Sequence, residues 1–324
     1  MNKRKLLTVI LTWNDFDNTN KCLESCKKSK SENTTFLLVD NNSTDGSLEK
    51  IINKFKLKNV SDKIFDQNSD KFIFIKNSIN LGCGFGHNTG YRFAIKNKFK
   101  YVARIDNDMQ FGSDFFNENL NILDKNPKID ALSPKIMYQK KKNKIWWMGC
   151  KIGNNLKFQT HMRDYPYNLD DNENFKNLRE TDAIAGCASI MRVKRLEEVG
   201  LSDKDFFYGP EDIEFSRRIY SGANSLMVNL NSKIFHAVTQ SFKPKHSFRR
   251  KYFEHKYRLL LVKKIGTQND KIMGYTVSII KFGLYCFFCF KKKHREKIRP
   301  VFKSLCDFFI FKRYGDYDRK KNNS

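Results

Sequence analysis

The amino-acid sequence predicts an α/β protein in which a mostly parallel sheet is flanked by helices. Two observations lead to this fold class. Over the first 130 residues, short apolar runs alternate with longer stretches of mixed composition, as in repeated strand–loop–helix units. The first run, Leu6–Leu11, is apolar apart from Thr8, which is the pattern of a strand buried on both faces.

Four strands and three helices are expected in this first part. The strands are Leu6–Leu11, Phe36–Val39, Phe72–Ile75 and Tyr101–Ile105, and the helices are Asn18–Lys28, Ser47–Phe55 and His87–Lys98. Three glycines, Gly82, Gly84 and Gly86, follow the third strand and permit close backbone approach to a ligand. Their spacing departs from the dinucleotide-binding fingerprint, because His87 or Thr89 stands where its third glycine belongs.

The middle of the chain is less regular. Strands are expected at Ala131–Tyr138, Ile145–Met148, Ser225–Val228 and Lys233–Phe235, a helix at Val193–Val199, and a polar loop at residues 163–180. A further helix opens at Pro210 and runs to Ser221. Proline at the first helical position, with Glu211 and Asp212 in the first turn, gives the expected start signals of this helix.

The composition changes near residue 241, so we expect one domain at residues 1–240 and a basic, helical extension at residues 241–324. The chain has a net charge of +26, and the extension alone, with 23 Lys/Arg and 6 Asp/Glu, contributes +17. A segment of this charge can serve an anionic lipid surface, a nucleic acid or an anionic substrate.

The apolar run Ile272–Phe290 in the extension allows more than one interpretation. It has the length of a membrane span, but Lys281 near its centre makes insertion marginal. An interfacial helix, with the basic run Lys291–Arg299 against anionic lipid, fits better, and a helix packed on the first domain is the structural alternative. Nucleic-acid binding is disfavoured, because the sequence has no recognised nucleic-acid module.

The eight cysteines are not spaced as in a zinc ribbon, and the apolar run at the N-terminus is too short for a secretory signal. We therefore expect a cytoplasmic protein with reduced thiols, peripheral at the inner face of the cell membrane.

The triplet Asp106-Asn107-Asp108 directly follows the fourth predicted strand. In open α/β sheets, ligands bind at this end of the strands. Two carboxylates so close together suit a divalent cation that carries a phosphate. An ordinary polar turn is the alternative, since Asp and Asn favour turns.

Five segments, in this order, resemble those of inverting family 2 glycosyltransferases, the nucleotide-sugar enzymes of GT-A fold, and in particular the rhamnosyltransferase type. They are residues 8–14 (TVILTWN), 38–46 (LVDNNSTDG), 80–90 (NLGCGFGHNTG), 105–108 (IDND) and 206–214 (FFYGPEDIE), with His236 downstream. The resemblance implies a Rossmann-like sheet of the GT-A type over about residues 6–240. The Q-x-x-R-W sequence of processive members is absent, so a single transfer is expected.

The resemblance also implies a donor site and a metal site. The implied donor-binding residues are Thr12, Asn14, Asp40, Asn80, Gly82, Asn88 and Asp106. Asp40 would accept a hydrogen bond from the N–H of a uracil or thymine. The implied ligands of Mn²⁺ or Mg²⁺ are Asp106, Asp108 and His236, and mixed oxygen and nitrogen ligation favours Mn²⁺. A buried or strand-end histidine is the alternative for His236.

Asp212 is the implied catalytic base, which would take the proton of the acceptor hydroxyl, whereas helix capping is its structural alternative. The resemblance thus implies transfer of one sugar from a UDP- or dTDP-linked donor to a glycan or lipid-linked glycan. The competing class is a non-enzymatic basic protein that binds nucleic acid or membrane through residues 241–324.

Overall fold

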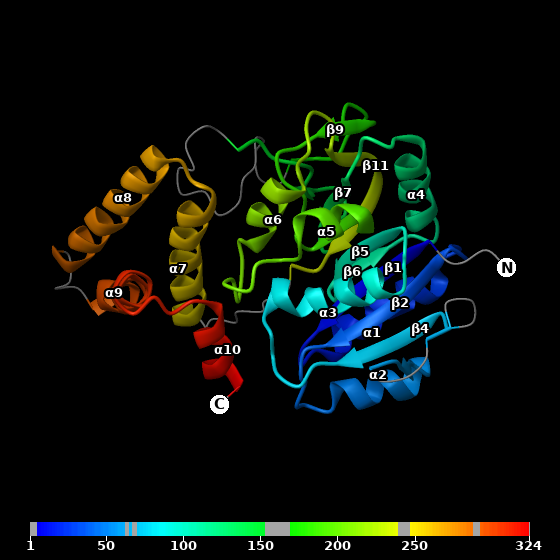
Figure 1. Ribbon diagram of the computed structural model, residues 1–324, viewed down its shortest axis with the longest axis horizontal. Coiled ribbons are helices and arrows are strands. Elements are labelled where there is room, and N and C mark those ends of the chain that lie inside the picture. The colour runs from blue at the N-terminus through cyan, green and yellow to red at the C-terminus, as the bar shows by residue number, and fades with distance from the viewer. Residues whose placement is uncertain are drawn as a thin grey trace.

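The computed structural model describes residues 5–61, 65–66, 70–152, 169–238, 247–287 and 292–323 (Figure 1). The strands are β1 (Leu6–Thr12), β2 (Thr34–Asp40), β3 (Lys58–Asn59), β4 (Phe72–Lys76), β5 (Tyr101–Asp106), β6 (Met109–Phe111), β7 (Ala131–Tyr138), β8 (Ile145–Trp147), β9 (Leu178–Glu180), β10 (Ala188–Arg192) and β11 (Leu226–His236). The helices are α1 (Phe16–Lys28), α2 (Ser47–Phe55), α3 (Cys83–Lys96), α4 (Phe115–Lys125), α5 (Val193–Val199), α6 (Glu211–Ile219), α7 (Ser247–Ile265), α8 (Gln268–Phe287), α9 (Lys292–Leu305), the π-helical segment η2 (Cys306–Ile310) and α10 (Gly315–Asn323).

All these strands join one sheet, in the order β3-β4-β2-β1-β5-β10-β7-β11-β6, with β8 on β7 and β9 on β11. The α/β fold with a large sheet flanked by helices is therefore confirmed. The half from β3 to β5 is parallel. Its register places Thr12 opposite Asp40 and Leu11 opposite Asp106, so the polar ends of β1, β2 and β5 meet at one edge of the sheet.

The other half of the sheet is mixed. β10 runs antiparallel to both of its neighbours, β5 and β7, whereas β11 runs parallel to β7. The sequence predicted two short strands where the structure has the single strand β11, because an irregularity between Asn229 and Lys233 interrupts the pairing with β7 but not the strand. The far end of β11 pairs with β6, which places His236 opposite Met109, next to the aspartate triplet.

Two hydrophobic cores lie on opposite faces of the sheet because successive strand residues point in opposite directions. Leu6 and Ile10 of β1 pack with apolar residues of α1, α2 and α4. Leu7 and Val9 pack with apolar residues of α3, α5 and α6. The sheet is thus covered by helices on both sides, as the apolar strands required.

A third core joins the C-terminal helices to the rest of the protein. Phe206, Phe207 and Ile213, beside and within α6, cluster with apolar residues of α7, α9 and η2. The rings of Phe207 and Phe253 lie 5.5 Å apart. Part of the C-terminal region therefore packs directly against the segment that leads into α6. Within the described residues, no helix combines the length and the apolar composition needed to cross a membrane.

Candidate active site

Asp40 ends β2 and is fully buried. Its Oδ2 accepts a hydrogen bond of 2.9 Å from the backbone N–H of Ser43, whereas Oδ1 has no partner among the described residues. An unsatisfied buried acceptor destabilises a fold by about 1–3 kcal/mol, so such atoms call for an explanation. A donor N–H from a bound ligand would satisfy Oδ1.

The loops after β1 and β2 are fastened to each other next to Asp40. The side-chain oxygen of Asn14 accepts a hydrogen bond of 2.8 Å from the N–H of Thr44, and the Asn14 N–H donates to Ser43 Oγ at 2.9 Å. Asn14 has φ +49°, a conformation that asparagine tolerates better than most residues. The Thr12 hydroxyl lies 2.7 Å from that of Thr19. Thr12 and Asn14 therefore shape the loops beside Asp40.

Three further residues expected at the donor site, Asn80, Gly82 and Asn88, are engaged within the protein. Asn80 Oδ1 accepts hydrogen bonds from the Gly82 N–H and from Asn41 Nδ2, each 2.9 Å long. Gly82 has φ +82°, and a Cβ there would overlap the carbonyl oxygen of Phe207. The Asn88 amide exchanges two hydrogen bonds with the backbone of Ser202. These contacts build the loop into α3, and direct contact of these residues with a donor stays a prediction.

The aspartate triplet lies at the carboxyl end of β5, and its members point to different neighbours. Asp108 Oδ2 lies 3.1 Å from His236 Nε2, and both side chains are largely buried. His236 Nδ1 is also buried and has no hydrogen bond to any described residue. Asn107 turns the other way and donates to Asp15 Oδ2 at 3.2 Å and to Thr19 Oγ1 at 3.0 Å. It therefore shapes the turn against the start of α1.

Burial raises the pKa of Asp106 to about 7, the charge of Arg104 opposes this shift, and the charge of Asp108 adds to it. Asp108 and His236 contact each other, and the charge of Asp108 acts on Asp106. Among the described residues these three side chains do not bring their possible ligand atoms within 4.8 Å of one another, so their joint binding of a metal stays a prediction. A bound dication would offset the mutual repulsion of the two carboxylates. This donor set fits Mn²⁺ or Mg²⁺, with the imidazole favouring Mn²⁺.

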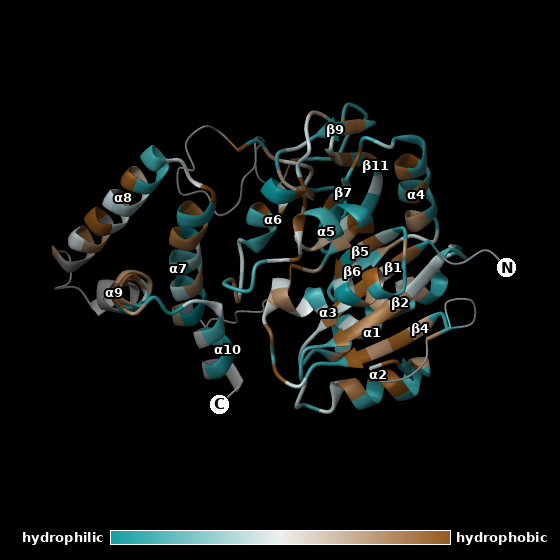
Figure 2. Ribbon diagram, in the orientation of Figure 1, coloured by the Kyte–Doolittle hydropathy of each residue, from teal (hydrophilic) through white to brown (hydrophobic). Residues whose placement is uncertain are grey.

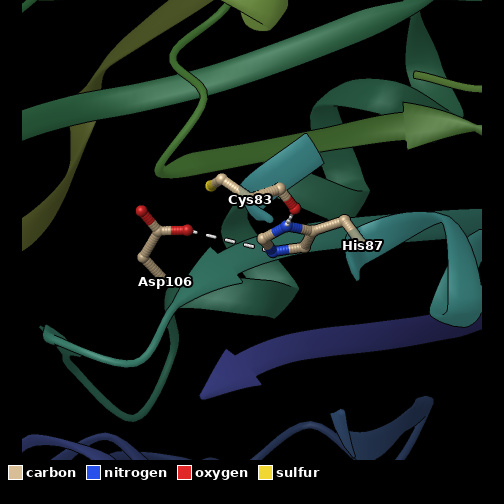
Figure 3. Close-up of side chains that lie close together, drawn as sticks. All are labelled: Cys83, His87 and Asp106. Carbon is tan, nitrogen blue, oxygen red and sulfur yellow. Dashed lines mark hydrogen bonds and ion pairs between the residues drawn. The ribbon is translucent and has the colours of Figure 1, made fainter. Parts of the chain in front are cut away.

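A second group of possible metal ligands, which the sequence analysis did not predict, includes Asp106 itself. Cys83, His87 and Asp106 face one another in Figure 3, and their possible ligand atoms all lie within 4.8 Å. His87 is fully buried, with Nδ1 3.1 Å from the Cys83 carbonyl oxygen and Nε2 3.8 Å from Asp106 Oδ1. Burial lowers the pKa of His87 well below its usual value, so the ring is neutral.

The surroundings of Cys83 argue against a metal ion at this second group. Burial raises the pKa of its thiol well above the usual value, and Arg104 Nη2 lies 3.2 Å from Sγ. A protonated thiol beside a guanidinium is a poor cation ligand. The neutral His87 ring instead lies beside Asp106 without a hydrogen bond from Nε2 to any described residue. The sequence feature that could have indicated this group is His87, which stands where the dinucleotide-binding fingerprint has its third glycine.

Asp212 is the second residue of α6, whose first turn holds three acidic residues. Its Oδ2 accepts a hydrogen bond of 3.2 Å from the Gly186 N–H, and its Oδ1 accepts one of 2.9 Å from the Ile213 N–H. A Cβ at Gly186 would lie 2.8 Å from Oδ2, so glycine permits the close approach. Burial raises the pKa of Asp212 to about 6, the charge of Glu211 adds to the shift, and Arg104 opposes it.

Arg104 connects Asp212 to the aspartate triplet. It lies on β5, is buried, and forms an ion pair of 2.8 Å with Glu211, the neighbour of Asp212. The pKa of the Cys187 thiol is affected by three carboxylates at once. Burial first, and then the charges of Asp106, Asp108 and Asp212, raise its pKa well above the usual value. Asp106, Asp108 and Asp212 therefore all lie near Cys187, and their roles as metal ligands and as base stay predictions.

The fold of the chain is shared with solved glycosyltransferase structures. GalNAc-T7 with UDP, GalNAc and Mn²⁺ has a TM-score of 0.57 and 14% identity, covering 80% of this chain and 51% of that one. The mannosyltransferase PcManGT from Pyrobaculum calidifontis, with GDP-Man and Mn²⁺, has a TM-score of 0.54 and 12% identity, covering 96% and 88%. S. aureus TarS 1–349 with UDP has a TM-score of 0.50 and 17% identity, covering 79% and 65%.

This chain spans between 44 and 65% of the length of the TarS and GalNAc-T7 chains that it matches. No protein of curated function matches it by sequence. Residues 8–200, more than half of the chain, match the family described as Glycosyl transferase family 2. The chain therefore belongs to glycosyl transferase family 2.

Proposed function

We propose that this protein is an inverting glycosyltransferase of the rhamnosyltransferase type. It moves a single hexose or deoxyhexose from a UDP- or dTDP-linked donor to a hydroxyl group of a glycan or a lipid-linked glycan. The observation that carries the proposal is the Asp212 carboxylate, which is partly buried and whose pKa is raised to about 6 by burial and by the charge of Glu211. A general base works best when its pKa lies near the working pH.

Donor binding starts at Asp40, whose unsatisfied Oδ1 would accept the N–H of a uracil or thymine base. The loops of Thr12 and Asn14 flank the nucleotide. Support for a nucleoside-diphosphate donor comes from the UDP bound by TarS and the UDP and Mn²⁺ bound by GalNAc-T7. Asp106, Asp108 and His236 would hold Mn²⁺ or Mg²⁺, which when bound supplies charge stabilisation to the departing diphosphate.

Asp212 performs the proton transfer. Each of its carboxylate oxygens accepts one backbone hydrogen bond and keeps a further lone pair. The acceptor hydroxyl gives its proton to this carboxylate while its oxygen attacks the anomeric carbon. The bond from that carbon to the diphosphate oxygen breaks on the opposite face, so the configuration inverts. No second carboxylic acid has to protonate the leaving group, unlike in glycoside hydrolysis.

The same proposal covers the setting of the reaction. Residues 1–240 form the catalytic unit, and residues 241–324, with their net charge of +17, attach it to an anionic membrane. The protein would then be cytoplasmic and peripheral at the inner face of the cell membrane. There it would act on a lipid-linked acceptor in the synthesis of cell-surface polysaccharide.

The reaction is tested with nucleotides first and with one substitution second. UDP or dTDP, in the presence of Mn²⁺, should raise the melting temperature of the protein, and a panel of nucleotide sugars should identify the donor by turnover. Asp212→Asn should keep the nucleotide-dependent rise in melting temperature but lose turnover by about 10²–10⁴-fold.

Asp114→Asn serves as the matched control, because Asp114 is a surface residue paired only with Lys30 and Ser113 among the described residues. This control should turn over like the unmodified protein. Near-normal turnover by Asp212→Asn would exclude Asp212 as the base. No thermal response to any nucleotide with Mn²⁺ would contradict the enzyme assignment itself.

A further inference from the structure

Helix α8 exposes a row of large apolar residues, which is unusual for a surface helix. Six large apolar residues are between 42 and 76% exposed: Ile272, Met273, Ile279, Ile280, Leu284 and Phe287. Their spacing puts them on one face of the helix. The face that packs against other helices carries the buried residues Gly274 and Ser278 and the partly buried rings of Tyr275 and Phe282. α8 thus has apolar residues on both sides, and Figure 2 shows apolar segments along it in brown.

The apolar surface continues from α8 onto η2. Tyr275 of α8 contacts the ring of Phe309 edge-on, with centroids 5.2 Å apart. Phe309 is followed by Ile310 and Phe311, which are 68 and 54% exposed. Two neighbouring helical segments thus present one apolar surface, which we call the α8–η2 face. Soluble proteins rarely expose a contiguous surface of this kind unless it meets a partner.

Basic residues border the α8–η2 face. The Arg313 guanidinium lies over the exposed ring of Phe311, 4.4 Å from its centroid, and Lys312 between them is exposed. From Lys271 to Leu305 the sequence contains nine Lys/Arg residues and a single acidic residue, Glu296. An apolar face with a basic border is complementary to a bilayer that contains anionic lipids.

We infer that the α8–η2 face binds an anionic lipid bilayer, with α8 lying in the interface rather than crossing it. In this arrangement the apolar side chains of α8 enter the boundary between headgroups and acyl chains. The basic run Lys291–Arg299 is then not the only part of the chain that contacts the membrane. This inference deepens the proposed function by naming the part of the chain that meets the membrane. It does not require sugar transfer to occur.

The test is the binding of the full-length protein to vesicles, measured by co-sedimentation without nucleotide or sugar. Vesicles of phosphatidylcholine with phosphatidylglycerol should bind the protein, and vesicles of phosphatidylcholine alone should bind it much less. The double variant Ile279→Glu/Ile280→Glu should bind at least about tenfold more weakly, because burial of even one such side chain is worth about that factor.

Leu178→Glu is the matched control, since Leu178 is an exposed apolar residue on β9, a strand of the central sheet. It should bind vesicles like the unmodified protein. The thermal response to UDP or dTDP with Mn²⁺ should be the same in both variants, which separates a failure of membrane binding from a failure of the proposed reaction.

Two results would overturn the inference. One is vesicle binding by Ile279→Glu/Ile280→Glu that equals that of the unmodified protein. The other is an unmodified protein that ignores vesicles but dimerises in light scattering, with the double variant monomeric. The α8–η2 face would then cover a second copy of the chain.

Discussion

At the scale of single residues, Arg104 sets the electrostatics of the site. It is buried on β5, pairs with Glu211, and its charge lowers the pKa values of both Asp106 and Asp212. Burial acts in the opposite direction on both carboxyls and is the larger effect. The pKa of Asp212 is therefore set by a balance between burial, the negative charge of Glu211 and the positive charge of Arg104.

This balance predicts the pH dependence of turnover. Asp212 accepts a proton only when it is ionised, so turnover should fall as the pH drops below about 6. Glu211→Gln removes the charge that raises the pKa of Asp212 and leaves the charge of Arg104, which lowers it. The pKa of Asp212 should therefore fall, and the acidic limb of the pH profile should move to lower pH.

The measurement is the pH profile of kcat. The quantity to compare is the position of the acidic limb, because a loss of folded protein at a given pH-independent level lowers the rate without moving the limb. Glu214→Gln on the same helix is the control, because Glu214 pairs with Arg218 and not with Arg104. Its acidic limb should stay in place. A limb that moves to higher pH in Glu211→Gln, or equally in both variants, would contradict this account of the Asp212 pKa.

At the scale of elements, the sequence predicted the bounds of a helix or strand correctly where the pattern of apolar residues and end signals was local. The expected helices Ser47–Phe55 and Val193–Val199 and the expected strand Ala131–Tyr138 have the bounds that the structure gives them. The helix expected at His87–Lys98 begins earlier, at Cys83, because α3 includes Gly84 and Gly86. Glycine normally disfavours a helix interior, but close contact with neighbouring elements outweighs that tendency here.

Two elements that follow the aspartate triplet were not predicted. β6 has only three residues and exists through its pairing with β11, which the local sequence does not encode. α4 does carry a helical pattern, since Phe115, Phe116, Leu120 and Leu123 are buried along one face. The unsatisfied Oδ1 of Asp40 and the burial of His87 depend on contacts between distant segments. Motif order could locate such residues but not their hydrogen bonds.

The close contact between α3 and β1 yields a prediction at this scale. A Cβ at Gly90 would overlap both methyl groups of Val9 in β1. Gly90→Ala should therefore lower the free energy of unfolding by about 1–3 kcal/mol, the usual effect of overpacking, although alanine favours helix. Gly112→Ala is the control, because a Cβ at Gly112 meets no described atom within 4 Å.

Urea unfolding of the two variants measures the difference between them. Gly112→Ala should unfold close to the unmodified protein. If Gly90→Ala proved as stable as Gly112→Ala, the contact between α3 and β1 would be looser than the structure describes. Gly90 would then need another role within its motif.

At the scale of the whole molecule, the C-terminal region has one part that packs on the rest of the protein and one part that is exposed. α7, which precedes the run Ile272–Phe290, packs on the segment before α6 through Phe253 and Tyr257. α8 leaves an apolar face exposed, as membrane attachment would require. The region is therefore bound to the catalytic part of the chain on one side and carries an uncovered surface on another.

A buried ion pair joins the last helix of the chain to α7. Lys256 is fully buried, forms an ion pair with Asp318 of α10, and donates hydrogen bonds to the Tyr252 hydroxyl at 2.9 Å and the Arg313 carbonyl oxygen at 3.1 Å. Burial lowers the pKa of Lys256, whereas the charge of Asp318 opposes this shift. Without Asp318 the ammonium group would lose the main charge that compensates its burial.

Asp318→Leu should therefore lower the free energy of unfolding by about 3–5 kcal/mol, the usual effect of removing one partner of a buried ion pair. Adding Lys256→Met should restore most of the loss, because two apolar side chains can replace a buried pair at little cost. Urea unfolding measures both variants. A double variant no more stable than Asp318→Leu would contradict the role of the uncompensated charge, and the loss would then reflect the packing of α10 on α7.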